Sequence, residues 1–230
     1  ASALHYNPAG LSMGQPQLRG QYQPYELMLS HSLHIENIAL DQIGFLRRPF
    51  GVSMTSLRIV DIEQRTSETA QPEAQFGASD LSLGLSYGGK IGDVGVGATA
   101  KFIRQTIGDA SAQAFAVDLC VLHRFDGLPF SLGAGLANLG TKIRFLDEAA
   151  PLPTTLRLGA TAGLRKSFPH ALSLQLDFPR DSNPIIRFGV EYLGFGPFAL
   201  RMGYRKFQRK QRDAVHGRAL GSSASGLSEF

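Results

Sequence analysis

The feature that most restricts the fold of this chain is a two-residue alternation of apolar and polar side chains, which recurs from residue 81 to residue 205. In segment 172–178, for example, every even position is leucine or phenylalanine, and Ser173, Gln175 and Asp177 lie between them. Successive side chains of a β-strand point to opposite faces, so this period predicts strands with one apolar and one polar face. We expect about eleven strands, which start near residues 17, 31, 50, 80, 93, 113, 129, 155, 171, 185 and 197.

The connections between these strands alternate in length. Short turns are expected at 47–49, 90–92, 126–128, 167–170 and 194–196, and longer links at 63–79, 108–112, 139–154 and 180–184. Every second connection of an up-and-down sheet lies at the same end, so one rim would collect the short turns and the other the long loops. That asymmetry is typical of β-barrels that span a membrane, and strands of about 9 to 12 residues suit such a barrel. Loops 63–79 and 139–154 and the lumen are the expected places of function.

Composition limits the alternatives. Charged residues make up 18% of the chain, below the roughly 25% of soluble domains, and no apolar run approaches the length of a transmembrane helix. The net charge of +4 is spread along the chain, which argues against a nucleic-acid partner. Cys120 is the one cysteine, so an intramolecular disulfide and a multi-cysteine zinc site are excluded. The 230 residues are expected to form a single domain, 1–230.

Two glycine-rich segments match nucleotide-binding motifs in part. Segment 84–90 has the glycine and lysine spacing of a phosphate-binding loop, but Ile91 replaces the magnesium-binding Ser or Thr and a strand follows. Segment 95–100 lies inside an alternating strand, where its glycines are small wall residues. The six histidines show no metal-ligand spacing, and no serine is marked as a nucleophile. We therefore expect no catalytic residues, no cofactor and no metal, and the chain is not expected to be an enzyme.

The polar faces of the later strands carry charges of both signs. These residues are Asp118, Arg157, Arg165, Asp177, Arg187, Glu191, Arg201 and Arg205. Charged side chains are costly toward lipid, so they predict which face of a barrel points into the lumen. Two interpretations stay open: a polar conduit or binding surface for an anionic ligand, and a structural ladder that holds a narrow barrel in shape.

Two short motifs carry a family resemblance. Asn7, Pro8, Ala9, Gly10 and Leu11 resemble the motif that opens the FadL-like outer-membrane barrels, and especially the PorV/PorQ group. A second match, similar to PorV/PorQ-like sequences, comprises Asn138-Leu139-Gly140, then Leu152-Pro153, then Leu156-Arg157-Leu158-Gly159. The two motifs lie in the family's order and span most of the chain.

The resemblance implies a bacterial outer-membrane barrel of about fourteen strands whose N-terminal segment, residues 1–15, is a plug inside the lumen. Asn7, Pro8, Ala9 and Gly10 would belong to that plug. FadL moves hydrophobic molecules inward, whereas PorV-like proteins take part in type IX secretion and hold the C-terminal domains of exported cargo. The implied partners are outer-membrane lipid and either secreted cargo proteins or a hydrophobic small molecule.

The chain departs from the family near its C-terminal end. Segment 207–230 is first basic and then rich in serine and glycine, without alternation, so we expect a loop or an incomplete C-terminal part there and about three closing strands fewer than the family has. The leading hypothesis is a PorV/PorQ-type barrel that binds or passes cargo. The alternatives are a soluble β-sheet module that binds an apolar ligand and an outer-membrane hydrolase.

Overall fold

The computed structural model describes residues 3–13, 25–34, 37–64, 72–145, 148–163, 170–195 and 198–207. Two short helical elements, α1 (Ala3–Tyr6) and the 3₁₀ turn η1 (Pro8–Leu11), precede the strands. The strands are β1 (Glu26–His34), β2 (Ile38–Arg47), β3 (Phe50–Gln64), β4 (Ala74–Ile91), β5 (Val94–Ile107), β6 (Ala110–Arg124), β7 (Phe130–Gly140), β8 (Ile143–Phe145), β9 (Glu148–Ala150), β10 (Thr155–Ala162), β11 (His170–Pro179), β12 (Ile185–Phe195) and β13 (Phe198–Phe207).

Eleven of the described strands form one antiparallel sheet in chain order, from β1 to β7 and then from β10 to β13. Strands β8 and β9 form a separate hairpin between β7 and β10. Each of these eleven strands pairs antiparallel with the next one of the sheet along the chain, an arrangement that tight turns and short links allow. The predictions of an all-β, antiparallel meander with about eleven strands are thus confirmed.

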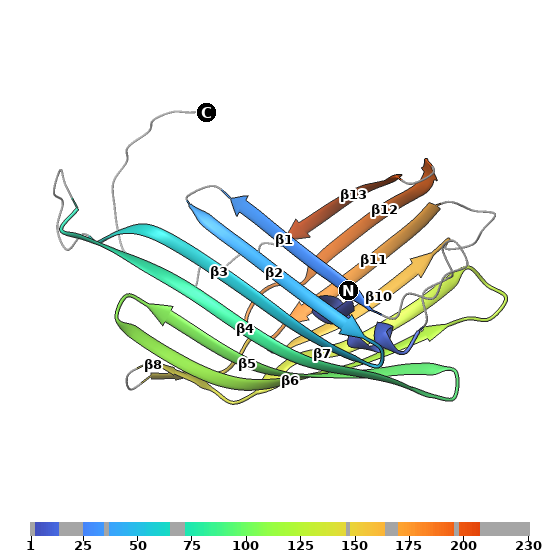
Figure 1. Ribbon diagram of the computed structural model, residues 1–230, viewed down its shortest axis with the longest axis horizontal. Helices are drawn as coiled ribbons and strands as arrows, with labels where there is room; N and C mark the ends of the chain where they lie inside the picture. The colour runs from blue at the N-terminus through green and yellow to red at the C-terminus, as the bar shows by residue number, and fades with distance from the viewer. Residues whose placement is uncertain are drawn as a thin grey trace, which may run out of the picture.

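The sheet curls around the N-terminal elements. In Figure 1, β1 and β2 lie in front, β10 to β13 lie behind, and α1 lies between them. Strands β1 and β13 are the two edges of the sheet and do not pair with each other in the described part of the chain. The expected closed barrel is therefore not observed, and neither is the count of fourteen strands.

The strand starts near the N-terminal end differ from the prediction. The start predicted near residue 17 lies outside the described residues, and the start predicted near residue 31 falls inside β1, which begins at Glu26, while β2 begins at Ile38. The error arises because this part of the sequence alternates weakly. Segment 31–34, for example, reads His, Ser, Leu, His and continues the first strand.

Several predicted connections are also revised. The expected link 108–112 is a tight turn at Gly108 and Asp109, which Gly108 permits through its positive φ of 55°. Loop 63–79 is shortened at both ends because β3 runs to Gln64 and β4 begins at Ala74, while residues 65–71 lie outside the described residues. The turns predicted at 167–170 and 194–196 fall largely or partly outside them too. The turns at 47–49, 90–92 and 126–128 are confirmed.

The two faces of the sheet differ in kind. We call the face that carries α1 and η1 the inner face and the opposite one the outer face. Buried apolar clusters among the described residues are small and include Leu4, Leu11 and Leu46 on the inner face. The outer face instead exposes many large apolar side chains, among them Leu29, Leu83, Leu85, Phe115, Leu119, Leu132, Leu174 and Met202. This distribution is the reverse of a soluble domain, which buries such residues and exposes only small apolar patches.

No described helix has both the length and the apolar character that crossing a membrane requires.

Candidate functional site: the inner face

The N-terminal segment lies against the middle of the inner face. Asn7 caps η1, since its Oδ1 accepts a hydrogen bond of 3.0 Å from the backbone N–H of Ala9. Its Nδ2 donates to the carbonyl oxygen of Val121 on β6, at 3.2 Å. Pro8, Ala9 and Leu11 are buried. The four residues of the predicted plug motif, Asn7, Pro8, Ala9 and Gly10, thus form one turn that is hydrogen-bonded to the sheet.

Glycines of four strands make room for this segment. A Cβ at Gly88 would lie 2.6 Å from Cβ of Leu11, and one at Gly97 would collide with the backbone of Ala9. We call Gly51, Gly88, Gly95, Gly97 and Gly133 the glycine track, because a Cβ at each would meet an atom of residues 4–13 at closer than ordinary contact distance. The sequence indicated that Gly95 and Gly97 are small residues of the barrel wall, but it did not indicate that they contact another segment. That contact arises only because the sheet curls around residues 3–13.

A buried polar belt lies next to the glycine track. Ser86 and Thr99 are both 1% exposed and share a hydrogen bond of 2.7 Å between their hydroxyls. Lys101 Nζ lies 2.5 Å from Asp118 Oδ2, and both side chains are largely buried. Asp118, predicted to face the lumen, therefore lies on the inner face as one half of an ion pair.

The turn at Asn138 ties this ion pair to the second sequence motif. Asn138 has a left-handed φ of 59°, and its N–H donates to Asp118 Oδ1 at 2.8 Å. Its side-chain oxygen accepts from Lys101 at 3.1 Å, and its Nδ2 donates to the carbonyl of Pro153 at 3.2 Å. A Cβ at Gly140 would collide with the carbonyl oxygen of Phe115. The first two parts of the motif, Asn138 to Gly140 and Leu152-Pro153, thus meet at one corner of the sheet.

Beyond this corner, part of segment 139–154 folds onto the inner face. Ile143 and Leu152 are each 6% exposed and pack against an alanine stripe on β6, formed by Ala112, Ala114 and Ala116. These alanines point to the same face as Asp118 because they share its even numbering along one strand. The prediction of a rim loop therefore needs revision, since Ile143 at the start of the β8–β9 hairpin and Leu152, two residues after its end, are buried against the sheet.

The remaining predicted lumen residues lie together on β10 to β13. The cross-strand register runs from Gly97 through Cys120, Gly135 and Arg157 to Asp177, which puts all of them on the inner face. Arg187 forms an ion pair with Asp177, and Arg201 Nη2 lies 2.6 Å from Glu191 Oε1. Arg205 is the register partner of Arg187. Arg165 lies outside the described residues.

A cavity of about 190 Å³ lies between the N-terminal segment and this charged region. Its polar lining includes Asn7, Ser131, Arg157, Thr161 and Gln175. Arg157 Nη1 donates to the carbonyl oxygen of Tyr6 at 3.5 Å, and Gln175 Nε2 donates to Asp177 Oδ1 at 2.7 Å. The cavity could not be predicted from sequence, because its walls come from five separate segments.

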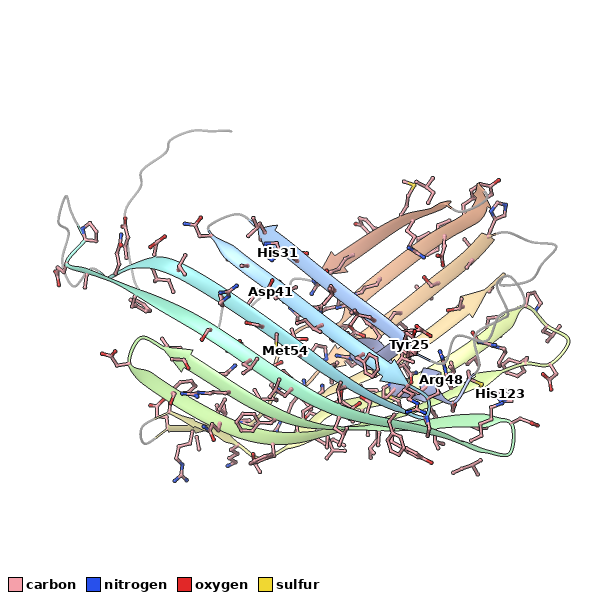
Figure 2. The ribbon with its side chains drawn as sticks, in the orientation of Figure 1. Tyr25, His31, Asp41, Arg48, Met54 and His123 are labelled. Carbon is pink, nitrogen blue, oxygen red and sulfur yellow. The ribbon has the colours of Figure 1, made fainter. Side chains whose placement is uncertain are left out.

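The outer face has a charged cluster at one boundary of its apolar surface. His31 Nδ1 lies 2.6 Å from Asp41 Oδ1, and Arg58 Nη2 lies 3.0 Å from Asp41 Oδ2. Figure 2 shows His31 on β1 beside Asp41 on β2. Among the described residues no cluster of three or more His, Cys, Asp or Glu could hold a metal ion.

Comparison with known proteins returns no relative. No protein-family model, curated protein or solved structure matches the chain. The function is therefore argued from the geometry of the two faces and from the motifs.

Proposed function

We propose that this chain is a membrane-spanning β-barrel domain of the bacterial outer-membrane type, which binds or passes material through a plugged interior without covalent chemistry. The observation that carries the proposal is the outer face. A large apolar surface exposed on a sheet requires a cover, and lipid is the cover that suits a curved sheet with a polar inner face.

The apolar side chains of the outer face follow the cross-strand register. One row of register partners from β1 to β6 comprises Leu29, Ile43, Met54, Leu83, Phe102 and Phe115. The next row toward the His31 end comprises His31, Asp41, Ser56, Leu81, Arg104 and Gln113, of which only Leu81 is apolar. The change from an apolar to a polar row across five neighbouring pairs supports a boundary between hydrocarbon and headgroups.

Aromatic pairs lie near both ends of this apolar surface. Phe102 and Phe115 have ring centroids 5.5 Å apart beside the polar row, and Phe50 and Tyr87 have centroids 5.3 Å apart near the short-turn rim. Aromatic side chains gather at both interfaces of membrane barrels. Strand β4 has 18 residues, more than the roughly 9–11 that a tilted membrane strand needs, so we propose that it extends beyond the bilayer.

The resemblance to PorV/PorQ-like and FadL-like barrels also supports a membrane-spanning barrel, and it suggests which kinds of cargo the barrel binds or passes. In that reading the N-terminal segment is the plug, and the partner is either a secreted protein or a hydrophobic small molecule. Both sheet edges continue the apolar outer face, with Leu27 64% exposed on β1 and Met202 70% exposed on β13. We propose that further strands, to a total of about fourteen, complete the barrel between these edges.

Labelling of neighbouring residues tests the proposal. In a Cys120→Ser background, single cysteines replace Leu132 and Leu174 on the outer face and Ser131 and Ser173 on the inner face, in protein folded into lipid vesicles. A membrane-embedded reagent should label only the first pair, and a water-soluble reagent only the second, because adjacent strand residues face opposite sides. Water-soluble labelling of Leu132→Cys and Leu174→Cys would overturn the membrane assignment and favour a soluble sheet that binds an apolar ligand.

A further inference from the structure

We propose that the inner face of β10 to β13 is a path for small anions, and that anions bind in the cavity beside Arg157 as they move along this path. The inference rests on the proposed function in one respect, since a path needs a membrane. The binding step itself can be measured without one.

Among the described residues, segments of the chain pack on one side of the interior and not on the other. The inner face of β3 to β6, which we call the covered wall, holds α1 and η1 on the glycine track and holds Ile143 and Leu152 on the alanine stripe. The inner face of β10 to β13, the uncovered wall, has no such packed segment among the described residues. It meets the N-terminal segment through the hydrogen bond from Arg157 to Tyr6. Material that moves past the plug would therefore pass along the uncovered wall.

The uncovered wall carries excess positive charge. The described side chains of this wall include four arginines, Arg157, Arg187, Arg201 and Arg205, and two acids, Asp177 and Glu191, so their formal charges sum to +2. The covered wall is balanced at its centre, where Lys101 pairs with Asp118. A surface with net charge of one sign, inside walls of low dielectric constant, concentrates ions of the opposite charge. The uncovered wall would therefore concentrate anions.

The cavity has the chemistry of an oxyanion site. Arg157, Ser131 and Thr161 can donate hydrogen bonds into it, and none of the described residues that line it is acidic. Asp177 is nearby, but the side chains of Arg187 and Gln175 already bind it. A guanidinium binds a planar or tetrahedral oxyanion through two parallel N–H groups.

The size of the cavity restricts the ligand. Its volume of about 190 Å³ corresponds to roughly six water molecules at ~30 Å³ each. That space admits phosphate or a short carboxylate. The donors and the volume together point to small hydrophilic oxyanions at this site, whereas two hollows of the outer face are lined mainly by apolar residues such as Leu119, Leu132 and Leu174.

Inorganic phosphate is the probe for the binding step. Calorimetric titration of the folded full chain in detergent should show phosphate binding that Arg157→Gln weakens by about tenfold or more, since a charged hydrogen bond contributes ~1.5–3 kcal/mol. Arg58→Gln is the matched control, because it removes the same charge from the exposed cluster on the outer face. The control should leave the affinity unchanged. Absence of phosphate binding, or equal weakening by both variants, would overturn the proposed site.

Reversal potentials in planar bilayers test the path. Under a potassium chloride gradient the protein should prefer chloride over potassium, and Arg157→Gln should reduce that preference while Arg58→Gln should not. A preference for potassium would overturn the anion path. Failure of the barrel assignment is recognised separately by the cysteine labelling pattern, and phosphate binding in detergent would still report on the cavity.

Discussion

The covered wall and the uncovered wall belong to one sheet and share one kind of outer face, yet their inner faces differ. The covered wall is lined by residues with little or no side chain, such as Gly88, Gly97 and Ala114, wherever a segment packs on it. The uncovered wall carries long charged residues, such as Arg187, which pairs with Asp177 on the neighbouring strand, and Arg157, which donates to the carbonyl of Tyr6. The comparison shows that small inner residues leave space for a packed backbone segment, and that long charged residues occupy the wall on which no described segment packs.

The ion pair at the centre of the covered wall and the more exposed of the two pairs on the uncovered wall have different surroundings. Asp118 and Lys101 expose 8% and 19% of their side chains, whereas Glu191 and Arg201 expose 28% and 72%. A buried charge that loses its partner destabilises the fold strongly, whereas water screens an exposed charge and reduces that cost. Substitution of one partner in each pair therefore gives the sharpest test of the difference.

The largest effect is expected for Asp118→Asn. This change leaves Lys101 without its counter-charge and should lower the free energy of unfolding by about 3–5 kcal/mol. Glu191→Gln on the uncovered wall should lower it by only about 0–1 kcal/mol. Urea unfolding of the folded protein in detergent or lipid measures both values. Equal losses would show that these two ion pairs are solvated alike.

A smaller effect is expected for an added methyl group on the glycine track. Gly97→Ala places a Cβ against the backbone of Ala9, so the N-terminal segment must shift, at a cost of about 1–3 kcal/mol. At Gly159 on the uncovered wall the nearest atom to a new Cβ is 3.8 Å away, and Gly159→Ala should gain about 0.5–1 kcal/mol from the chain entropy of the unfolded state.

Limited proteolysis of the N-terminal segment distinguishes these outcomes. Cleavage within residues 3–13 should become faster in Gly97→Ala and stay unchanged in Gly159→Ala, while the sheet remains folded in both. Unchanged protection in Gly97→Ala would mean that the segment does not rest on the glycine track in solution.

The smallest effect concerns pH. Burial, followed by the charge of Lys101, lowers the pKa of His5, whose Nδ1 lies 3.4 Å from Thr55 Oγ1 on the covered wall. The neutral ring is therefore favoured in the attached segment. The attachment is fully present above the ordinary histidine pKa of about 6.5 and weakens as the pH falls through the lower value of the folded state.

The same proteolysis assay, run between neutral and acidic pH, measures this release. Cleavage should increase on acidification in the native sequence, and His5→Gln should remove most of that increase because glutamine does not titrate. Protection that rises as the pH falls would contradict the sign of the pKa shift.

The sequence predicted the strands best where alternation is strict. Strands β10 to β12 began within one residue of the expected positions, since Leu158, Leu174 and Phe188 mark one face without interruption. The start predicted near residue 31 falls inside β1, because the early segment alternates weakly. The short turn at Gly108 was read as a longer link, because glycine permits a tight turn without requiring one.

The sequence predicted a common face for the charged residues of the later strands but not their arrangement or the other residues of the site. Asp118, Arg157, Asp177 and the other described residues of that set share one face of the sheet, as the period of two requires. The pairing of Asp118 with Lys101 and Asn138 was not predicted. The contact of Asp118 with Asn138 lies at a register shift between β6 and β7, at Val117 and Leu119, which periodicity cannot locate.

By itself, the sequence determined which side chains share a face, because a strand places alternate residues on opposite sides whatever surrounds it. The tertiary structure alone decided which wall is covered. The segment at residues 4–13 reaches Gly97 and Gly133, and the hairpin returns to Ala114, only after the sheet has curled. These contacts join residues far apart in the chain, and their energy comes from packing between surfaces that do not exist until the strands are paired.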